Sequence, residues 1–279
     1  MNFGMRCHDI IGKSDIDTVL DAVKELGVHE IQLAMGKSIA GFDFNYGHYS
    51  PGFARMIRKK LDERDIHVSV LGCYINPTNP DENARQREVQ KFIEHLKYAK
   101  ILGADMVGTE TGRYDSTFKV VPYTYTEGCY QLLLKSMREI VAAAEKLGVT
   151  VGVEAVHDHT LYCPEMMRRF LEDIDSPNVE AILDPVNLIS AENYLNQDEE
   201  IEKAFRLYGD RISAVHVKDF VLVDGEPQFA FVGDGLFHYE PLLRNLKKDK
   251  PYISMLLESA SPERYHSDVE FLKKIYEAV

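Results

Sequence analysis

Residues 95–109 read HLKYAKILGADMVGT, and this stretch predicts the fold because it runs from a helix through a glycine into a strand. The same order recurs at residues 141–156, where VAAAEKLG precedes VTVGVEAV. Near the start, NFGMRC is typical of a strand, Ser14 of a helix N-cap, and DTVLDAVKEL of an amphipathic helix that Gly27 ends before VHEIQLAM. Helix, glycine and strand therefore form a repeating unit.

Applied to the whole chain, this pattern predicts strands near residues 2–7, 28–34, 66–73, 104–109, 149–155, 179–184, 211–217 and 251–258. Helices are predicted near 14–26, 51–64, 81–102, 127–147, 164–173, 197–208, 238–247 and 262–276. Apolar strands separated by helices indicate a parallel sheet covered by helices, and about eight units in roughly 250 residues match a closed (β/α)₈ barrel, an α/β fold. An open doubly wound sheet shares the alternation, but no GxGxxG follows the first strand. No Pro/Ser/Gly-rich linker interrupts the series, so residues 1–279 are predicted to form a single catalytic domain.

The composition excludes several classes of protein. The 32 Lys and Arg residues against 45 Asp and Glu residues give a net charge of −13, which argues against nucleic acid as a partner. The four cysteines are scattered without a CxxC pair, as expected for reduced thiols in a cytoplasmic protein. Neither a signal sequence nor about 18 consecutive apolar residues occurs, so we expect neither export nor membrane insertion.

Ionisable and polar side chains lie where the predicted strands end. In AVHVKDF, residues 214–220, an apolar run contains His216 and closes with Lys218 and Asp219. The other strand-end residues are Arg6, His8, Gln32, Asn76, Glu110, Glu154, His157, Asp184, Asn187 and Glu258. In a barrel of this kind the loops after the strands meet at one face, where catalysis takes place.

Four of these residues have almost wholly apolar neighbours: Glu154 in VGVEAV, Asp184 in AILDPV, His216 in AVHVKD and Glu258 in SMLLES. Carboxylates that converge in apolar surroundings repel one another unless a cation lies among them. Three carboxylates with one imidazole suit Mn²⁺, Zn²⁺, Co²⁺ or Fe²⁺, and the ligand types alone do not choose among these ions. The sequence therefore predicts one divalent metal ion.

Each of the four also has an ordinary structural explanation. Glu154 or Glu258 can pair with Arg6 or Lys218, a lone buried histidine is more often a hydrogen-bonded core residue, and the Asp184–Pro185 step can begin a turn. The occurrence of all four at the ends of four consecutive strands favours the metal site.

The order VGVEAV, ILDPVN, HVKD and LLES, with YINP after the third strand, resembles the sugar phosphate isomerase/epimerase group of xylose isomerase-like TIM barrels, in the AP endonuclease 2 superfamily. The resemblance spans nearly the whole chain. In that family a Glu, Asp, His, Glu quartet binds one divalent metal and the two glutamates also move substrate protons. The resemblance therefore implies Glu154, Asp184, His216 and Glu258 as metal ligands, with Glu154 and Glu258 as catalytic residues. It also implies a homodimer or a homotetramer.

Two departures from the family pattern restrict these expectations. Ketose 3-epimerases of the group usually carry a histidine three residues after the metal-binding Asp, where this chain has Asn187, so sugar binding is expected to differ. The endonuclease IV branch uses further histidines where this chain has Asn76, Glu110 and Asn187, and this chain lacks the Asp-x-His after the seventh strand. Together with the acidic charge, these differences argue against DNA repair.

The expected function is that of a divalent-metal-dependent isomerase or epimerase of a sugar, sugar acid or related polyol, acting through an enediolate. Expected substrate contacts are Arg6, His8, Asn76, His157, Asn187 and Lys218, although Lys218 can instead pair with Asp219 or Glu258. Apart from the metal, no cofactor is expected. A metal-dependent dehydratase of an inosose-like keto-polyol uses the same residues, and a non-catalytic sugar-binding barrel or a phosphodiester hydrolase is a weaker alternative.

Two long loops are expected near the site. Residues 110–126 contain Tyr114, Phe118, Tyr123 and Tyr125, which suit the apolar face of a sugar or else ordinary packing. Residues 219–237 contain a hairpin signal at Asp224–Gly225 and then VGDG, which favours a plain turn over a phosphate site because no Lys or Arg is adjacent. His159 is expected to be a solvated loop histidine.

Overall fold

The computed structural model describes residues 1–279 and contains a closed barrel of eight parallel strands. The barrel strands are β1 (Asn2–Arg6), β2 (Glu30–Leu33), β3 (His67–Gly72), β4 (Ala104–Glu110), β5 (Thr150–Glu154), β6 (Val179–Leu183), β7 (Ile212–Val217) and β10 (Ser254–Leu257). They follow one another around the ring in chain order, and β10 closes it by pairing with both β7 and β1. The predicted (β/α)₈ barrel is confirmed.

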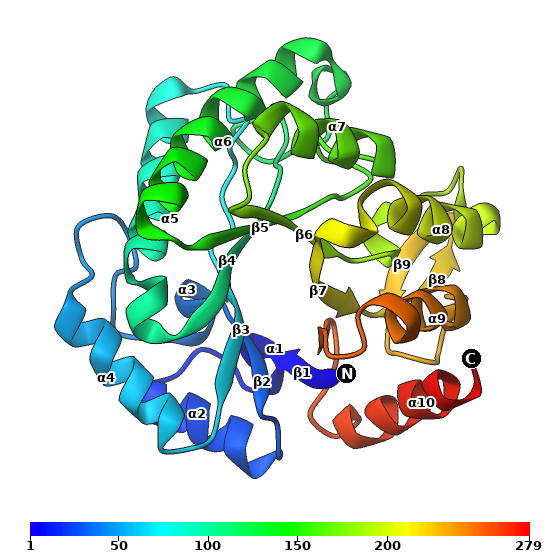
Figure 1. The fold of residues 1–279 in the computed structure, drawn as a ribbon, viewed down its shortest axis with the longest axis horizontal. Coiled ribbons are helices and arrows are strands. Elements are labelled where there is room, and N and C mark those ends of the chain that lie inside the picture. The colour runs from blue at the N-terminus through cyan, green and yellow to red at the C-terminus, as the bar shows by residue number, and fades with distance from the viewer.

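Helices surround the barrel, and the colour in Figure 1 runs once around the ring from the N-terminus to the C-terminus. The main helices are α2 (Ile16–Glu25), α4 (Pro51–Asp62), α5 (Glu82–Leu102), α6 (Glu127–Leu147), α7 (Pro164–Ile174), α8 (Gln197–Tyr208), α9 (Tyr239–Asp249) and α10 (Tyr265–Ala278). Short helices α1 (Cys7–Ile10) and α3 (Met35–Ser38) and four 3₁₀ turns, Pro122–Tyr125, Val186–Leu188, Tyr194–Asn196 and Gly209–Arg211, lie in the connections. Every predicted helix and strand is present, with ends that shift by a few residues.

The core has two parts, as the barrel geometry requires. A large cluster fills the space between strands and helices, and a second cluster consists of Val70, Met106, Ile182, Ala214 and Leu256. These five side chains come from five different barrel strands, and four of them are β-branched or long apolar residues of the kind that fill a barrel interior. The interior is thus packed, and functional side chains must lie at its end.

The start of α2 differs from the sequence prediction. Asp15, not Ser14, is the N-cap, and its Oδ1 accepts hydrogen bonds of 3.1 Å from the backbone N–H groups of Asp17 and Thr18. Ser14 instead pairs through its backbone with residues 38 and 40 of the chain after β2. A carboxylate and a hydroxyl both cap helices well, so sequence alone does not decide between neighbours.

A two-stranded hairpin, β8 (Asp219–Val223) and β9 (Glu226–Ala230), follows β7 outside the barrel. Asp224 and Gly225 form its two-residue turn with φ of 53° and 86°, which confirms the predicted hairpin. The buried Asp219 carboxylate accepts hydrogen bonds from the amides of Gly233 and Phe237 at 3.1 and 2.9 Å. Because this carboxylate already binds the Gly233 amide of the VGDG segment and the Phe237 amide just after it, the plain-turn interpretation is favoured over a phosphate site.

All four cysteines are free thiols, as predicted. The structure contains no helix with the length and apolar character needed to cross a membrane.

Candidate metal centre

The four residues of the predicted quartet come together at the carboxyl end of the barrel. Glu154 is the last residue of β5, His216 lies near the end of β7, and Asp184 and Glu258 directly follow β6 and β10. All four are at least 94% buried relative to full exposure. The parallel strands thus bring to one place residues that are up to about a hundred positions apart in sequence.

The imidazole of His216 is the centre of this group. Its Nδ1 lies 3.0 Å from Glu154 Oε2 and 3.2 Å from Glu258 Oε1. One potential ligand atom from each of Glu154, Asp184 and His216 lies within 4.8 Å of the others. The geometry therefore places two carboxylates directly against one ring nitrogen and the third close by.

These spacings fit a divalent cation. Nitrogen and oxygen ligands bind Zn²⁺ and similar ions at about 2.0–2.2 Å, so two ligand atoms at right angles lie about 3 Å apart and opposite ones about 4 Å apart. In the metal-free centre the 3.0 Å contact at His216 Nδ1 is a hydrogen bond to Glu154, and the 4.8 Å limit for the triad is close enough to these spacings for one ion to replace the shared proton. Glu154, Asp184 and His216 can therefore hold a metal ion.

Protein cations also lie against the carboxylates. Lys218, 2% exposed, places Nζ 2.7 Å from Asp184 Oδ2 and 3.1 Å from Glu258 Oε2. Arg6 Nη1 lies 3.2 Å from the same Glu258 oxygen, and its Nε donates to Asp9. The sequence left open whether Lys218 pairs with Asp219 or Glu258. In the structure Lys218 forms ion pairs with Glu258 and Asp184.

The pKa values reflect this crowding. Burial lowers the pKa of His216, but Glu258 and Glu154 outweigh it and raise the pKa to about 9. Burial raises the pKa of Asp184 to about 6 against the opposing effect of Lys218. Burial also disfavours the charge on Glu258, yet Lys218 and His216 hold its pKa well below the usual value. Before a metal binds, His216 therefore carries a proton at neutral pH.

Asn187 connects two of the candidate ligands. Its Nδ2 donates to Glu154 Oε1 at 2.5 Å, and its backbone N–H donates to Asp184 Oδ1 at 3.0 Å. Its carbonyl oxygen accepts from the backbone N–H of His157 at 2.7 Å. The amide side chain is thus engaged with Glu154, which orients that carboxylate, and the substrate-binding role expected for Asn187 stays a prediction.

The other expected substrate contacts differ in their surroundings. His8 is partly exposed beside Arg6, its Nδ1 has no hydrogen-bond partner, and burial together with Arg6 lowers its pKa to about 4. The Asn76 side chain bonds to the chain after β4: it donates to Asp115 O at 3.0 Å and accepts from the Arg113 N–H at 3.1 Å. Asn76 therefore holds this loop in place.

Glu110 and Tyr74 have strongly shifted pKa values near the quartet, which the sequence did not indicate. Burial, then Glu154 and Glu258, raise the pKa of Glu110 to about 8, so this carboxyl group is largely protonated at neutral pH. Tyr74 accepts a short hydrogen bond from the buried Gln32 side chain, and burial and Glu258 raise its pKa well above the usual value. Tyr74 lies in the YINP segment, which was the only sequence signal for it.

Two predictions about the loops near the quartet, the exposure of His159 and the clustering of the aromatic residues after β4, are wrong. His159 is 2% exposed rather than solvated, its ring packs edge-on against Phe118, and burial lowers its pKa to about 3. The four aromatic residues of the loop after β4 do not gather around one space. Tyr114 packs on Tyr123 with ring centroids 4.2 Å apart, whereas Tyr125 packs on Tyr162. Packing of the loop on its neighbours explains most of these rings.

The comparisons with known proteins agree with this architecture. The chain is 23% identical over 273 residues to the inosose dehydratase of Glaesserella parasuis serovar 5 (strain SH0165), with 88% of each chain covered. The crystal structure of a D-tagatose 3-epimerase-like protein matches with a TM-score of 0.78 and 20% identity, over 100% of this chain and 98% of the other. An IOLI protein with a bound zinc atom matches with a TM-score of 0.69 and 17% identity, over 100% and 96% of the two chains. A family model described as the xylose isomerase-like TIM barrel matches residues 20–275, so this chain belongs to that family.

Proposed function

We propose that this protein is a divalent-metal-dependent isomerase or epimerase of a sugar, sugar acid or related polyol. The observation that carries the proposal is the contact of His216 Nδ1 with both Glu154 and Glu258 at the carboxyl end of the barrel. A similar solved structure of a D-tagatose 3-epimerase-like protein supports the assignment. The substrate would be a small carbohydrate.

In this proposal Glu154, Asp184, His216 and Glu258 hold one Mn²⁺, Zn²⁺, Co²⁺ or Fe²⁺ ion. When bound, the ion supplies Lewis-acid polarisation of a substrate carbonyl, which acidifies the neighbouring C–H bond. The similar structure with a zinc atom supports a metal here.

The chain's own residues would then move one proton. Glu258 is ionised at neutral pH because Lys218 and His216 lower its pKa against the effect of burial, so it can accept the proton. Glu154 contacts the same His216 Nδ1 as Glu258 does, and Asn187 fixes one of its oxygens. Return of the proton from the opposite face would give an epimer, and return to the adjacent carbon would give an isomer. Lys218 can stabilise the enediolate oxygen because its pKa is held above the usual value: burial lowers it, but Asp184 and Glu258 raise it more.

A dehydratase is the second candidate, and Glu110 favours it. Elimination of water requires an acid for the leaving hydroxyl group, and the Glu110 carboxyl group, with a pKa of about 8, carries a proton at neutral pH. The 23% identity to an inosose dehydratase points to the same reaction class. Proton abstraction beside a carbonyl begins both reactions, so the quartet serves either.

The test is deuterium incorporation from D₂O at substrate C–H positions, followed by NMR over a panel of ketoses and keto-polyols with Mn²⁺ or Zn²⁺ added. Exchange without loss of water supports the isomerase, and a keto-deoxy product supports the dehydratase. Glu154→Gln and Glu258→Gln should each abolish exchange, whereas Glu180→Gln, at the opposite end of β6, should not. Absence of exchange with every panel member would count against both candidates.

The remaining expectations belong to the same proposal. A homodimer or homotetramer in the cytoplasm, without nucleic-acid or membrane partners, is the expected state. Sedimentation equilibrium of the whole chain measures the oligomer.

A further inference from the structure

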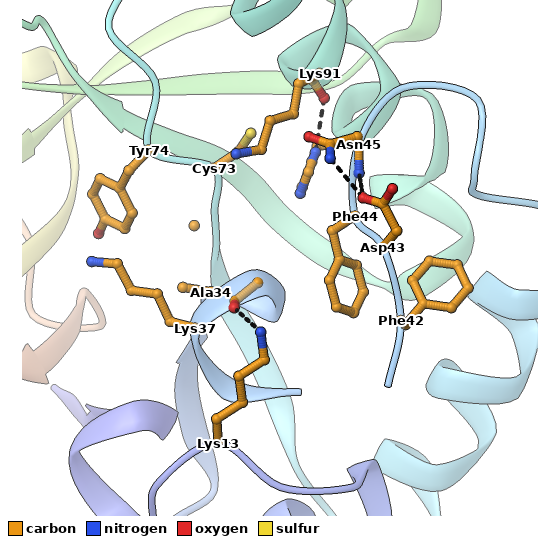
Figure 2. A pocket seen from close by; sticks show the side chains of 13 residues that line it. Lys13, Ala34, Lys37, Phe42, Asp43, Phe44, Asn45, Cys73, Tyr74 and Lys91 are labelled. Carbon is orange, nitrogen blue, oxygen red and sulfur yellow. Dashed lines mark hydrogen bonds between the residues drawn. The ribbon is translucent and has the colours of Figure 1, made fainter. Parts of the chain in front are cut away.

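A cavity of about 380 Å³ lies between the chain that follows β2 and the carboxyl end of β3. Figure 2 shows its lining, in which Lys37 extends towards Tyr74, Lys91 reaches the neighbourhood of Cys73, and Lys13 bonds to the backbone of the chain after β2. The three lysines come from the loop before α2, from α3 and from α5. Only the folded chain brings these positive charges together.

The three ammonium groups are free of carboxylate partners. Lys13 Nζ donates to the carbonyl oxygen of Gly36 at 2.8 Å, and Lys37 Nζ lies 4.5 Å from the ring centroid of Tyr74. None of the three has a carboxylate oxygen within 4.0 Å, although the chain carries a net charge of −13 and pairs many of its other lysines. The cavity is therefore a positively charged place in an acidic protein.

One acidic residue, Asp43, also lines the cavity, but its oxygens are already engaged. Its Oδ1 accepts from the backbone N–H of Asn45 at 2.9 Å, and its Oδ2 lies 3.4 Å from the ring of His48. The three lysines thus outnumber the single carboxylate, and that carboxylate has partners of its own.

A small residue leaves room for a ligand. Gly36 lines the cavity at its exposed side, and a Cβ atom added there would have no neighbour within 4 Å. A volume of about 380 Å³ accommodates a phosphate or carboxylate together with a few carbon atoms, since ligand pockets begin near 300 Å³.

The cavity shares two lining residues with a neighbouring cavity on the side of β4. Lys37 and Tyr74 also line a second cavity of about 470 Å³, which contains Glu110 at the end of β4. Glu110 is the register partner of Glu154 across the β4–β5 ladder. Lys37 and Tyr74 thus lie between the lysine-lined cavity and the second cavity, and Glu110 of that second cavity lies on the strand next to Glu154.

We propose that the substrate carries an anionic terminal group, a phosphate or a carboxylate, and that Lys13, Lys37 and Lys91 bind this group while the reacting carbons lie at the quartet. The proposal rests on the proposed carbohydrate chemistry and narrows its substrate class. Hydrogen bonds to charged groups are among the strong ones, so each lysine should contribute about tenfold to binding.

The first test measures binding alone, without turnover. Inorganic phosphate and acetate are titrated into the whole protein at low ionic strength by calorimetry, using wild type, Lys37→Met, Gly36→Leu and the control Lys24→Met. Lys24 is an exposed lysine on α2, outside the cavity. Lys37→Met should weaken phosphate binding about tenfold, Gly36→Leu should abolish it by filling the space, and Lys24→Met should leave it unchanged. Equal binding by all four proteins would overturn the proposal.

The second test measures selectivity in the deuterium exchange reaction, with D-fructose, D-fructose 6-phosphate and D-fructuronate as a neutral, a phosphorylated and a carboxylated probe. We expect kcat/KM to be at least tenfold higher for one of the anionic probes, which identifies the group, and Lys37→Met should reduce that preference about tenfold. Deuterium exchange with equal kcat/KM for the neutral and the anionic probes would overturn the proposed anion site but would still support the proposed isomerase or epimerase reaction. Lysine-dependent phosphate binding without exchange of any probe would support the anion site and count against the reaction.

Discussion

Metal binding at the quartet should release about one proton at neutral pH, because the metal and a proton compete for His216. The pKa of about 9 means that His216 is about 99% protonated at pH 7 in the metal-free protein, whereas an ordinary histidine of pKa 6.5 is about 24% protonated. Displacing that proton costs about two pK units at pH 7, or about 2.7 kcal/mol. The apparent affinity should therefore rise about tenfold per pH unit between pH 6.5 and 8.5.

The assay is calorimetric titration of Mn²⁺ into chelator-treated protein, in two buffers that differ in ionisation enthalpy. The difference between the two heats gives the number of protons released, which should be about 1.0 at pH 7. Glu258→Gln removes one of the two glutamates that raise the pKa of His216, so proton release should fall in that variant even where the metal still binds. A release near 0.2 protons in the wild type, the value for an unperturbed imidazole, would refute the reasoning.

Three substitutions test the surroundings of the quartet. Asn187→Ala removes the 2.5 Å hydrogen bond to Glu154 and should lower kcat or metal affinity about 10–100-fold. The circular dichroism spectrum should stay that of the wild type. Unchanged kinetics and affinity would contradict the role of Asn187 in positioning Glu154. Asp219→Ala removes the side-chain acceptor of the buried Phe220 and Phe237 amides and one of the two acceptors of the Gly233 amide. The free energy of unfolding in urea should fall by about 3 kcal/mol or more, whereas a loss below about 1 kcal/mol would show that the loop does not depend on this carboxylate. Phe229→Ala removes the ring 4.2 Å from Lys218 Nζ and should cost about 1 kcal/mol or less in stability, so a loss above about 3 kcal/mol would mean that the ring is a core residue.

The fold was predictable because its signals are local and repeated. Each helix that ends in a glycine, such as α5 at Gly103 with φ of 88° and α6 at Gly148 with φ of 63°, carries its stop signal in the sequence. An apolar strand follows each of these helices directly, so the order and the type of the helices and strands could be predicted from the sequence. The exact cap of α2 was wrong because Ser14 and Asp15 are both good caps and only tertiary contacts of Ser14 decide between them.

The quartet was predictable for a different reason: each member interrupts an apolar strand end, and a barrel brings strand ends together. The roles of its neighbours were less accessible. Nothing local shows that Lys218 turns towards Asp184 rather than Asp219, because that choice depends on the amides that occupy Asp219. His159 was misjudged since its burial depends on Phe118, which lies far away in sequence. Nothing in the sequence indicated the lysine-lined cavity, because residues 13, 37 and 91 line the same cavity only in the folded chain.

The position of β10 couples closure of the barrel to assembly of the polar centre. This strand joins β7 to β1, and the residue directly after it, Glu258, touches His216, Lys218 and Arg6. Until β10 pairs, the ring is open, and Arg6 and Lys218 lack Glu258, the carboxylate that they share. Closure of the barrel by β10 and completion of the polar centre by Glu258 are therefore one event, so all four quartet residues can hold an ion only after β10 has paired with both of its neighbours.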